Sequence, residues 1–229
     1  MQGGASPDEV WLAATWPFIR DQSPAQPATV VELGCGHAGG HIPALLRAGY
    51  DATGVDPEAP DASAYRREEF ENYRPDGPVD AVIASVSLHH VNDLGAVLDH
   101  VSDVLRPDGR LIVVEWISEG FNDATASWCF RHRLRDPAEH GGWLAKLHGA
   151  WADSALSWES FIRGWLEHHG LHPAFAIRRE LDARFVTIHE SSGPYFFPDL
   201  LDADARVEQA AIDAGEITAG CLRYAGRRA

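Results

Sequence analysis

A glycine-rich run that follows a short apolar segment restricts the fold of this chain more than any other feature. Residues 28–33 (ATVVEL) are mostly apolar and lead directly into GCGHAGG at 34–40. A short apolar run that ends in glycines predicts a buried β-strand followed by a tight turn. Glycine adopts backbone angles that other residues avoid, and it lets the main chain approach a ligand closely.

Strands and helices are predicted to alternate around this turn. Residues 41–48 carry helix signals at both ends, with Pro43 in the first turn and Gly49 after the last. Residues 94–105 show an apolar stripe at helical spacing. Further strands are predicted at 52–55, 65–70, 79–85 and 110–116, the last after a turn at 106–109 (RPDG). Such alternation predicts parallel strands with crossover helices, a Rossmann-like, doubly wound α/β sheet.

Outside this region the sequence changes in character. Residues 123–169 hold five of the eight tryptophans and have the pattern of three helices, whereas 173–190 have the pattern of strand and loop. We expect a helix in one or two pieces at 10–19, an aromatic loop at 192–201, a helix at 203–214 and a last strand at 217–226. Length favours a single domain over 1–229, with a core at 28–116, a helical insertion or lid at 117–172, and C-terminal strands and a loop at 173–229.

The charge of the chain excludes some partners. Acidic residues outnumber basic ones by 34 to 19, which gives a formal net charge of -15. Nucleic acids and anionic membranes need clustered Lys and Arg, so neither is an expected partner.

Three scattered cysteines are typical of reduced thiols, and neither a signal peptide nor a long apolar span is visible. We therefore expect a soluble, cytoplasmic protein.

A carboxylate is expected at the end of the second strand. Asp56 follows Gly34 by 22 residues, and glycines at 34, 36 and 39 form a G-x-G-x-x-G pattern. A carboxylate in that place can accept hydrogen bonds from both hydroxyls of a ribose. Glycine-rich turns also occur without ligands, and an acid at a strand end can simply be solvated. Strand, turn, helix and acid together favour a cofactor that contains a nucleoside.

Five sequence blocks resemble the class I S-adenosylmethionine-dependent methyltransferases, small-molecule type. They are VVELGCG at 30–36, TGVDP at 53–57, DAVIAS at 80–85, SLHHV at 87–91 and VLRPDGRL at 104–111. The resemblance covers about residues 28–116. It implies a seven-stranded, mostly parallel sheet, S-adenosylmethionine as cofactor and S-adenosylhomocysteine as product. The methyl acceptor is left open, since oxygen, nitrogen and carbon atoms are all methylated in this family.

The same resemblance implies contacts around the glycine-rich turn. Glu32 is expected near the methionine part of the cofactor. Gly34, Cys35 and Gly36 are expected to form the turn beneath it, where the small Cys35 side chain packs rather than reacts. Ala38 departs from the family, in which a glycine is common there, but is small enough to keep the turn.

Further cofactor contacts are implied at the ends of the next strands. Asp56, followed by Pro57, would hold the ribose. Glu69 and Phe70 match the position that contacts adenine, where an Asp and a small residue are commoner. Ser85 matches a backbone contact beside the methionine part.

Candidate catalytic side chains follow the fourth and fifth strands. His89 and His90 come after the fourth strand and Glu115 ends the fifth, at the edge where open sheets bind ligands. Methyl transfer needs an aligned nucleophile and, for some acceptors, the removal of a proton. An imidazole with a pKa of about 6.5 suits that task. Scaffolding histidines and a surface glutamate are the alternative interpretations.

Further residues are candidates for a metal site or for contacts with the methyl acceptor. His168, His169 and His172 could be metal ligands by spacing, but no Cys or second carboxylate completes a set, so no metal is expected. Acceptor contacts, or alternatively the packing of the insertion, are expected from aromatic and basic residues outside the blocks: Trp11, Trp16, Trp128, Phe130, Arg131, His132, Tyr195, Phe196 and Phe197. Trp116, which ends the fifth strand, could form an apolar wall of the site or belong to the core.

We therefore expect S-adenosylmethionine-dependent methyl transfer to a small molecule. Two alternatives stay open. A non-catalytic protein of this fold would bind the cofactor without turnover. A nicotinamide-dependent oxidoreductase also uses a glycine-rich turn, but it does not account for Glu32 in the motif or for the turn and strand after residue 105. Nucleic-acid methylation is disfavoured by the charge and by the lack of an Asn/Asp-Pro-Pro-Tyr/Phe motif after the fourth strand.

Overall fold

A computed structural model describes residues 5–136 and 142–228, which form two compact units. The sheet unit comprises residues 15–115, 172–191 and 222 onward. The aromatic unit comprises the residues up to 14, 116–171 and 192–221. The domain boundaries expected from the sequence stay a prediction.

The sheet unit is built on one mostly parallel sheet. In the described residues this sheet has seven strands in the order β3-β2-β1-β4-β5-β7-β6. The strands are β1 Thr29–Leu33, β2 Asp51–Val55, β3 Tyr65–Arg66, β4 Val79–Ser85, β5 Leu105–Trp116, β6 Phe185–Gly193 and β7 Cys221–Arg228. The pairings that join β3, β2, β1, β4 and β5 are all parallel. The predicted Rossmann-like fold is confirmed.

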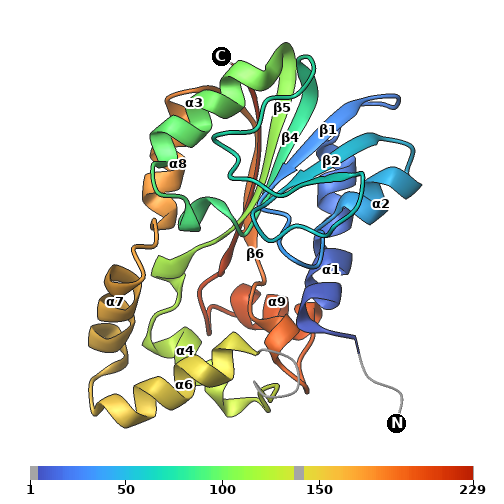
Figure 1. The fold of residues 1–229 in the computed structure, drawn as a ribbon. Coiled ribbons are helices and arrows are strands. Elements are labelled where there is room, and N and C mark those ends of the chain that lie inside the picture. The colour runs from blue at the N-terminus through green and yellow to red at the C-terminus, as the bar shows by residue number, and fades with distance from the viewer. Residues whose placement is uncertain (1–4, 137–141, 229) are drawn as a thin grey trace. The chain divides into compact units, whose positions relative to one another are not determined.

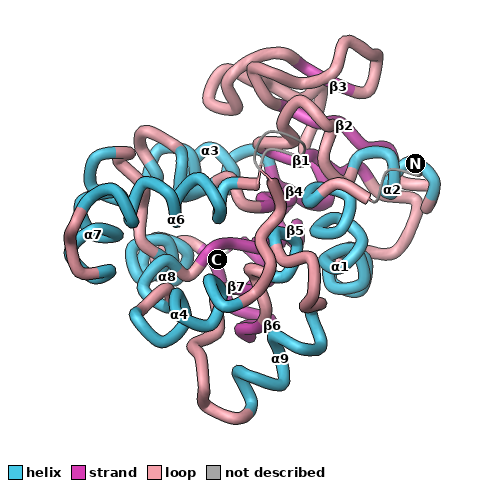
Figure 2. The backbone as a smooth tube through the Cα atoms, turned by 90° about the horizontal axis from the view of Figure 1, so that it is seen from below, coloured by secondary structure: helices cyan, strands magenta, loops and turns pink. Residues whose placement is uncertain are grey.

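Helices lie on both faces of the sheet. Figures 1 and 2 show α1 and α2 on one face and α3 and α8 on the other. These helices are α1 Pro7–Gln22, α2 Ile42–Arg47, α3 Leu94–Val104 and α8 Ala174–Asp182. Because both faces are covered, the central strands are apolar and buried along nearly their whole length, as in β1 and β4.

The aromatic unit is mainly helical. Its helices are α4 Asp123–Arg131, α6 Trp143–Ser154, α7 Trp158–His168 and α9 Ala205–Asp213, with short 3-10 turns η2 Ser118–Gly120 and η3 Phe197–Asp199. A buried cluster that includes Phe121, Trp158 and Phe196 forms its core. The indole N–H of Trp158 donates to the carbonyl of Phe121 at 2.6 Å, so this buried tryptophan is hydrogen-bonded as well as packed.

The direction of strand addition reverses at the middle of the sheet. After β1 the chain adds β2 and β3 on one side, whereas β4 pairs with the other edge of β1 and starts the second half. Open α/β sheets bind ligands outside the carboxyl ends of the strands at such a reversal. Here the glycine-rich run follows β1, and Ser85 ends β4.

Two sequence predictions about the strands are wrong in part. The strand expected at 65–70 contains only Tyr65 and Arg66, which pair with Gly54 and Val55. It stops there because the charged residues 66–69 lie largely at the surface. Residues 106–109, expected as a turn, lie within the bounds of β5, but they interrupt its pairing with β4, which passes from Val79–Leu105 to Ala81–Arg110.

The strand and loop expected at 173–190 begin with a helix instead. Ala174, Ile177 and Leu181 are buried in α8 at helical spacing. Charged residues on the opposite face of α8 mask this periodicity in the sequence. The helix expected at 10–19 is one helix, α1, which contains Pro17.

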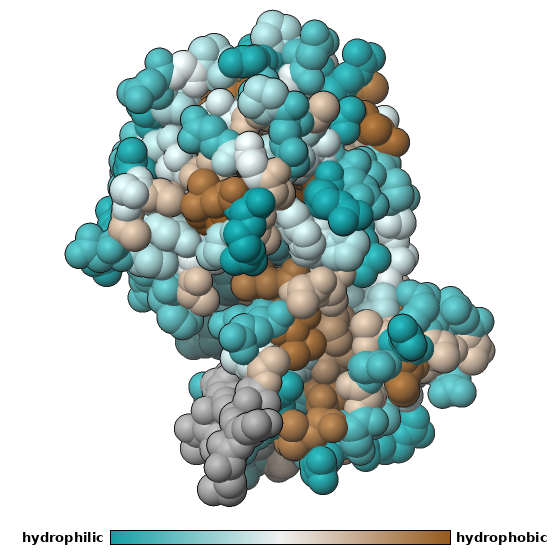
Figure 3. Space-filling view, turned by 90° about the vertical axis from the view of Figure 1, so that its right-hand side faces the viewer, coloured by the Kyte–Doolittle hydropathy of each residue, from teal (hydrophilic) through white to brown (hydrophobic). Residues whose placement is uncertain are grey.

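Figure 3 shows many hydrophilic residues on the face that it draws, together with hydrophobic areas that adjoin one another in the middle and lower part of the view. The many hydrophilic residues agree with the large excess of acidic residues. None of the helices in the described residues is long and apolar enough to span a bilayer.

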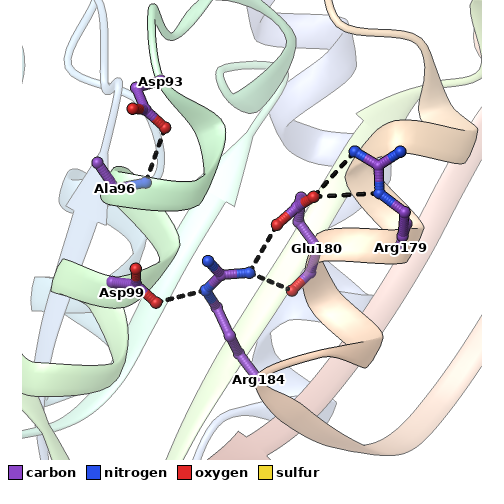
Figure 4. Close-up of polar contacts among 6 residues, drawn as sticks. All are labelled: Asp93, Ala96, Asp99, Arg179, Glu180 and Arg184. Carbon is purple, nitrogen blue, oxygen red and sulfur yellow. Dashed lines mark hydrogen bonds and ion pairs between the residues drawn. The ribbon is translucent and has the colours of Figure 1, made fainter.

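An arginine ties α8 to α3 (Figure 4). The Nε of Arg184 donates to Asp99 in α3 at 2.6 Å, and its Nη1 donates to the Glu180 carboxylate in α8 at 2.7 Å. Hydrogen bonds from Arg184 are the main cause of the lowered pKa values of Asp99 and Glu180. Arg179 also reaches Glu180, but it makes no bond to α3 in Figure 4.

We predict that Arg184→Gln lowers the melting temperature by a few degrees, whereas Arg179→Gln changes it little. Since the folded-state pKa values of both acids lie below their ordinary 3.8 and 4.5, this stabilisation is present above those values and is lost as the pH falls below them. Thermal unfolding of the three proteins between pH 3 and 7 measures it. Equal melting temperatures for wild type and Arg184→Gln at pH 7 would show that the bonds from Arg184 to Asp99 and Glu180 do not stabilise the fold.

Candidate functional site

The turn between β1 and α2 depends on its glycines. Gly34, Gly36, Gly39 and Gly40 have φ angles of 73°, 63°, 83° and 54°, a region that other residues rarely adopt. A Cβ on Gly34 would lie 2.3 Å from the Cβ of Ser87, so the main chain after β1 passes very close to the segment after β4. The tight turn predicted from the sequence is confirmed.

The carboxylate of Glu32 stabilises this turn through hydrogen bonds to His41. Its side chain is 1% exposed; Oε2 accepts the backbone N–H of His41 at 2.7 Å, and Oε1 lies 2.8 Å from Nδ1 of His41. Nδ1 therefore carries the proton, and in the neutral ring Nε2 accepts from the Thr15 hydroxyl at 2.9 Å. A Cβ on Gly40 would come within 2.5 Å of Oε2, so only glycine fits there. Glu32 thus fixes the start of α2 relative to β1.

Asp56 joins the turn after β1 to the turn after β2. Its Oδ2 accepts the N–H of Gly36 at 3.0 Å, and its Oδ1 accepts the N–H of Glu58 at 2.7 Å. The residue is half-buried, and Pro57 after it is exposed. A carboxylate offers about four acceptor positions, so two N–H donors leave room for a ribose diol.

Open space beside the turn fits a cofactor. A Cβ added to Gly36 would meet no heavy atom within 4 Å, in contrast to Gly34, Gly39 and Gly40. Backbone N–H groups, a half-buried carboxylate and an unfilled side of the turn therefore occur together at the reversal point of the sheet. These residues fit S-adenosylmethionine.

Cys35 packs inside the turn. Its sulfur lies 2.8 Å from the Cβ that Gly54 would carry, so the thiol sits against β2. Burial, together with the negative charges of Glu32 and Asp56, raises the pKa of the Cys35 thiol to about 12. The thiol stays protonated near neutral pH and is a poor nucleophile.

The segment after β4 is strained. Val86, which follows Ser85, has a φ of 54°, an uncommon value for a β-branched residue. Its N–H donates to the carbonyl of Val114 at 2.8 Å, and the hydroxyl of Ser87 donates to the carbonyl of Leu33 at 3.1 Å. Such strain persists where neighbouring contacts enforce it, commonly at ligand sites. Sequence reasoning missed Val86 because no residue type signals this conformation.

Glu69 and Phe70 lie in the turn that follows β3. Glu69 is exposed, whereas Phe70 is buried against the rings of Tyr73 and His100, at centroid distances of 6.4 and 5.1 Å. Phe70 thus packs the loop against α3. Their contact with adenine stays a prediction.

The candidate catalytic residues come together at the 3-10 turn η1, Leu88–His90. Glu115 is fully buried; its Oε2 accepts the N–H of Leu88 at 3.0 Å, and its Oε1 lies 2.5 Å from Nδ1 of His89. Glu115 is therefore not a surface residue. His89 is 4% exposed, while His90 is exposed with its ring 4.0 Å from that of His89.

A third histidine holds the same turn. The N–H of His172 donates to the carbonyl of His89 at 3.0 Å, and its Nε2 donates to the carbonyl of Val91 at 2.8 Å. His169, which was also weighed as a metal ligand, bonds through Nδ1 to the carbonyl of Trp165 at 2.7 Å. No metal-binding group of His, Cys, Asp and Glu occurs in the described residues, and the expected lack of a metal stays a prediction.

A buried glutamate shapes the aromatic loop of the aromatic unit. The Glu208 carboxylate accepts the N–H groups of Tyr195 at 2.7 Å, Phe196 at 3.1 Å and Phe197 at 2.7 Å. Burial raises its pKa despite these three bonds. Sequence reasoning missed Glu208, because the spacing of a helical glutamate does not reveal a distant loop as its partner.

Several of the predicted acceptor-contact residues lie side by side. The ring of Tyr195 lies edge-on to Trp11 at 5.3 Å and stacks on Trp116 at 5.9 Å, and Phe197 stacks near Trp11 at 6.3 Å. Others are elsewhere in the same unit: Trp128 beside His132, Phe130 beside His148, the exposed Arg131, and Phe196 in the core. Trp16 belongs to the sheet unit.

We predict that Gly34→Ala destabilises the protein more than Gly170→Ala. Both residues have positive φ, 73° and 63°, so both substitutions add backbone strain of about 1–2 kcal/mol. Only at Gly34 does the added Cβ also meet another residue, since nothing lies within 4 Å at Gly170. Denaturant unfolding of both variants measures the difference. Equal losses would show that the close approach to Ser87 is not required.

Comparisons with known proteins agree with this geometry. A family model described as a methyltransferase domain matches residues 12–185. The ubiquinone biosynthesis O-methyltransferase of Bradyrhizobium sp. is 32% identical over 97 residues, which cover 37% of this chain and 38% of that protein. The curated relatives that the chain matches are covered over 3% to 38% of their own length.

Solved structures share the fold along nearly the whole chain. An S-adenosylmethionine-dependent methyltransferase from Mesorhizobium loti is 20% identical with a TM-score of 0.55, and the match covers 94% of this chain and 98% of that one. Geranyl diphosphate C-methyltransferase from Streptomyces coelicolor is 16% identical with a TM-score of 0.57, over 95% of this chain and 76% of that one. The latter was crystallised with S-adenosylhomocysteine.

Proposed function

We propose that this chain, which belongs to the methyltransferase domain family, transfers a methyl group from S-adenosylmethionine to a small-molecule acceptor. The observation that carries the proposal is the glycine turn tied to Asp56 at the reversal point of the sheet. Similarity to an O-methyltransferase of ubiquinone biosynthesis and to a C-methyltransferase of geranyl diphosphate supports a small acceptor. A large excess of acidic residues weighs against a nucleic acid.

Residues of the sheet unit would hold the cofactor, which supplies a methyl group bonded to a positively charged sulfur. Asp56 would bind the ribose hydroxyls with its remaining acceptor positions. Gly34 and Gly36 would let the main chain approach the methionine part, with Ser85 beside it. Glu32 would act indirectly, through His41 and the turn, because its carboxylate is buried as well as bonded to His41 through both oxygens.

We further propose that His89 accepts a proton from a hydroxyl or amine acceptor. Since Glu115 accepts from Nδ1, the nitrogen that takes up a proton is Nε2. The buried carboxylate fixes the ring and would stabilise the imidazolium, as in other pairs of a base and an orienting acid. The alternative is that this pair only holds the turn at residues 88–91.

We predict that S-adenosylhomocysteine binds to the wild-type protein and binds Asp56→Ala about 10- to 100-fold more weakly, because hydrogen bonds to a charged group are lost. Asp61→Ala, which removes an exposed acid from the same loop, is the matched control and should bind normally. Isothermal titration calorimetry measures all three. Absence of binding to the wild type, or equal binding to Asp56→Ala, would overturn the proposed site. Binding of NADH instead would favour an oxidoreductase.

We predict that His89→Gln lowers methyl transfer by about 100-fold or more and leaves S-adenosylhomocysteine affinity unchanged. The assay uses labelled S-adenosylmethionine with a panel of phenols, alcohols and amines. His90→Gln, at the exposed neighbour, is the control and should retain its rate. Full activity of His89→Gln would show that the pair with Glu115 only holds the turn. No transfer to any member of the panel would favour a non-catalytic protein.

A further inference from the structure

A buried threonine of α1 bonds to the histidine that precedes α2. Thr15 lies in the part of α1 that belongs to the sheet unit, and it is 1% exposed. Its Oγ1 lies 2.9 Å from Nε2 of His41, which is equally buried and bonds through Nδ1 to Glu32 at 2.8 Å. Thr15, His41 and Glu32 therefore form a continuous hydrogen-bonded chain inside the sheet unit.

The ring of His41 is anchored at both of its nitrogens. Glu32 accepts the main-chain N–H of His41 and lies against Nδ1, while Thr15 holds Nε2 at the other edge of the ring. Without the Thr15 hydroxyl, Nε2 would be a buried polar atom that has lost this partner, and native proteins rarely contain unpaired buried polar atoms. Removing the hydroxyl therefore makes the observed orientation of the His41 ring less stable.

His41 ends the glycine-rich turn and is the N-cap of α2. Four glycines with positive φ occur at 34–40, and glycine has a wider choice of backbone angles than any other residue. Such a turn depends on contacts from outside it for a single conformation. Asp56 holds the turn at the N–H of Gly36, and the N–H of Gly39 donates to the carbonyl of Gly36 at 3.1 Å. The bonds of His41 hold the other end.

A turn that already has its binding conformation binds a ligand more tightly. When only a fraction of the molecules has that conformation, the apparent affinity falls by the same fraction. A side chain that anchors His41 can therefore change the affinity for a cofactor through the turn.

We propose that Thr15 is a positioning residue for the cofactor: by anchoring the ring of His41, it keeps the glycine turn in the conformation that binds S-adenosylmethionine. This inference rests on the proposed function, since it takes the turn to be the cofactor site. The sequence blocks at 30–111 assign no role to α1. The alternative is that the bond only holds α1 in place, in which case it would contribute to stability and not to affinity.

Calorimetry with S-adenosylhomocysteine on the full chain, together with thermal unfolding, tests this. Thr15→Val removes the hydroxyl but keeps the size and branching of the side chain, and it should weaken binding at least about fivefold. Thr15→Ser keeps the hydroxyl but loses a buried methyl group, so it should lower the melting temperature and still bind within about twofold of the wild type.

Thr125→Val is the matched control. Thr125 is also buried in a helix, α4 of the aromatic unit, and its hydroxyl accepts the N–H of Thr218 at 3.1 Å. Thr125→Val should lower the melting temperature and leave the affinity unchanged. If Thr15→Val does not fold, His41→Asn tests the same link, because its amide can replace Nδ1 toward Glu32 but is too short to reach Thr15. It should weaken binding to the same extent.

Wild-type affinity in Thr15→Val, or in His41→Asn, overturns the inference. A loss of affinity in Thr15→Ser as large as that in Thr15→Val overturns it as well, because affinity would then follow stability rather than the hydroxyl. In these cases the wild type still binds S-adenosylhomocysteine, so the proposed function stands. Absence of binding to the wild type would instead overturn the proposed function, and this inference with it.

Discussion

The candidate site depends on one buried carboxylate, that of Glu32. Both of its oxygens bond to His41, one to the main chain and one to the ring, at 2.7 and 2.8 Å. These bonds fix the first turn of α2 against β1 and bring the chain so close that residue 40 must be glycine. A buried hydrogen-bonding group that loses its partner typically costs about 1–3 kcal/mol, so these bonds hold the turn that faces the ligand firmly.

Two other buried carboxylates in the described residues hold irregular segments through similar hydrogen bonds. Glu115 accepts from the main-chain N–H of Leu88 and from the ring of His89, and Glu208 accepts from three consecutive N–H groups of the aromatic loop. In each case a buried acid from a strand or helix fixes an irregular segment that would otherwise have unpaired backbone groups. Some of the acidic excess of this chain is therefore structural. Asp199 is the exception, because one of its oxygens has no hydrogen-bond partner in the described residues.

Much of the fold could be predicted from the sequence, because the alternation of apolar segments and turn residues is a local signal. It located β1, β2, β4, α2 and α3 to within a few residues. It failed at α8, where charges on one face obscure the buried stripe. Candidate site residues could be proposed from the sequence only where they lie in a motif, as Gly34 and Asp56 do. The partners of Glu208 and the strained Val86 arise from tertiary contacts that no spacing reveals.

A crystal structure with S-adenosylhomocysteine tests the central claim most directly. We predict that the Asp56 carboxylate lies within hydrogen-bond distance of both ribose hydroxyls, with Gly34 and Gly36 beneath the homocysteine part. A ligand bound away from the carboxyl ends of β1 and β4, or an Asp56 carboxylate that makes no contact with it, would contradict the account.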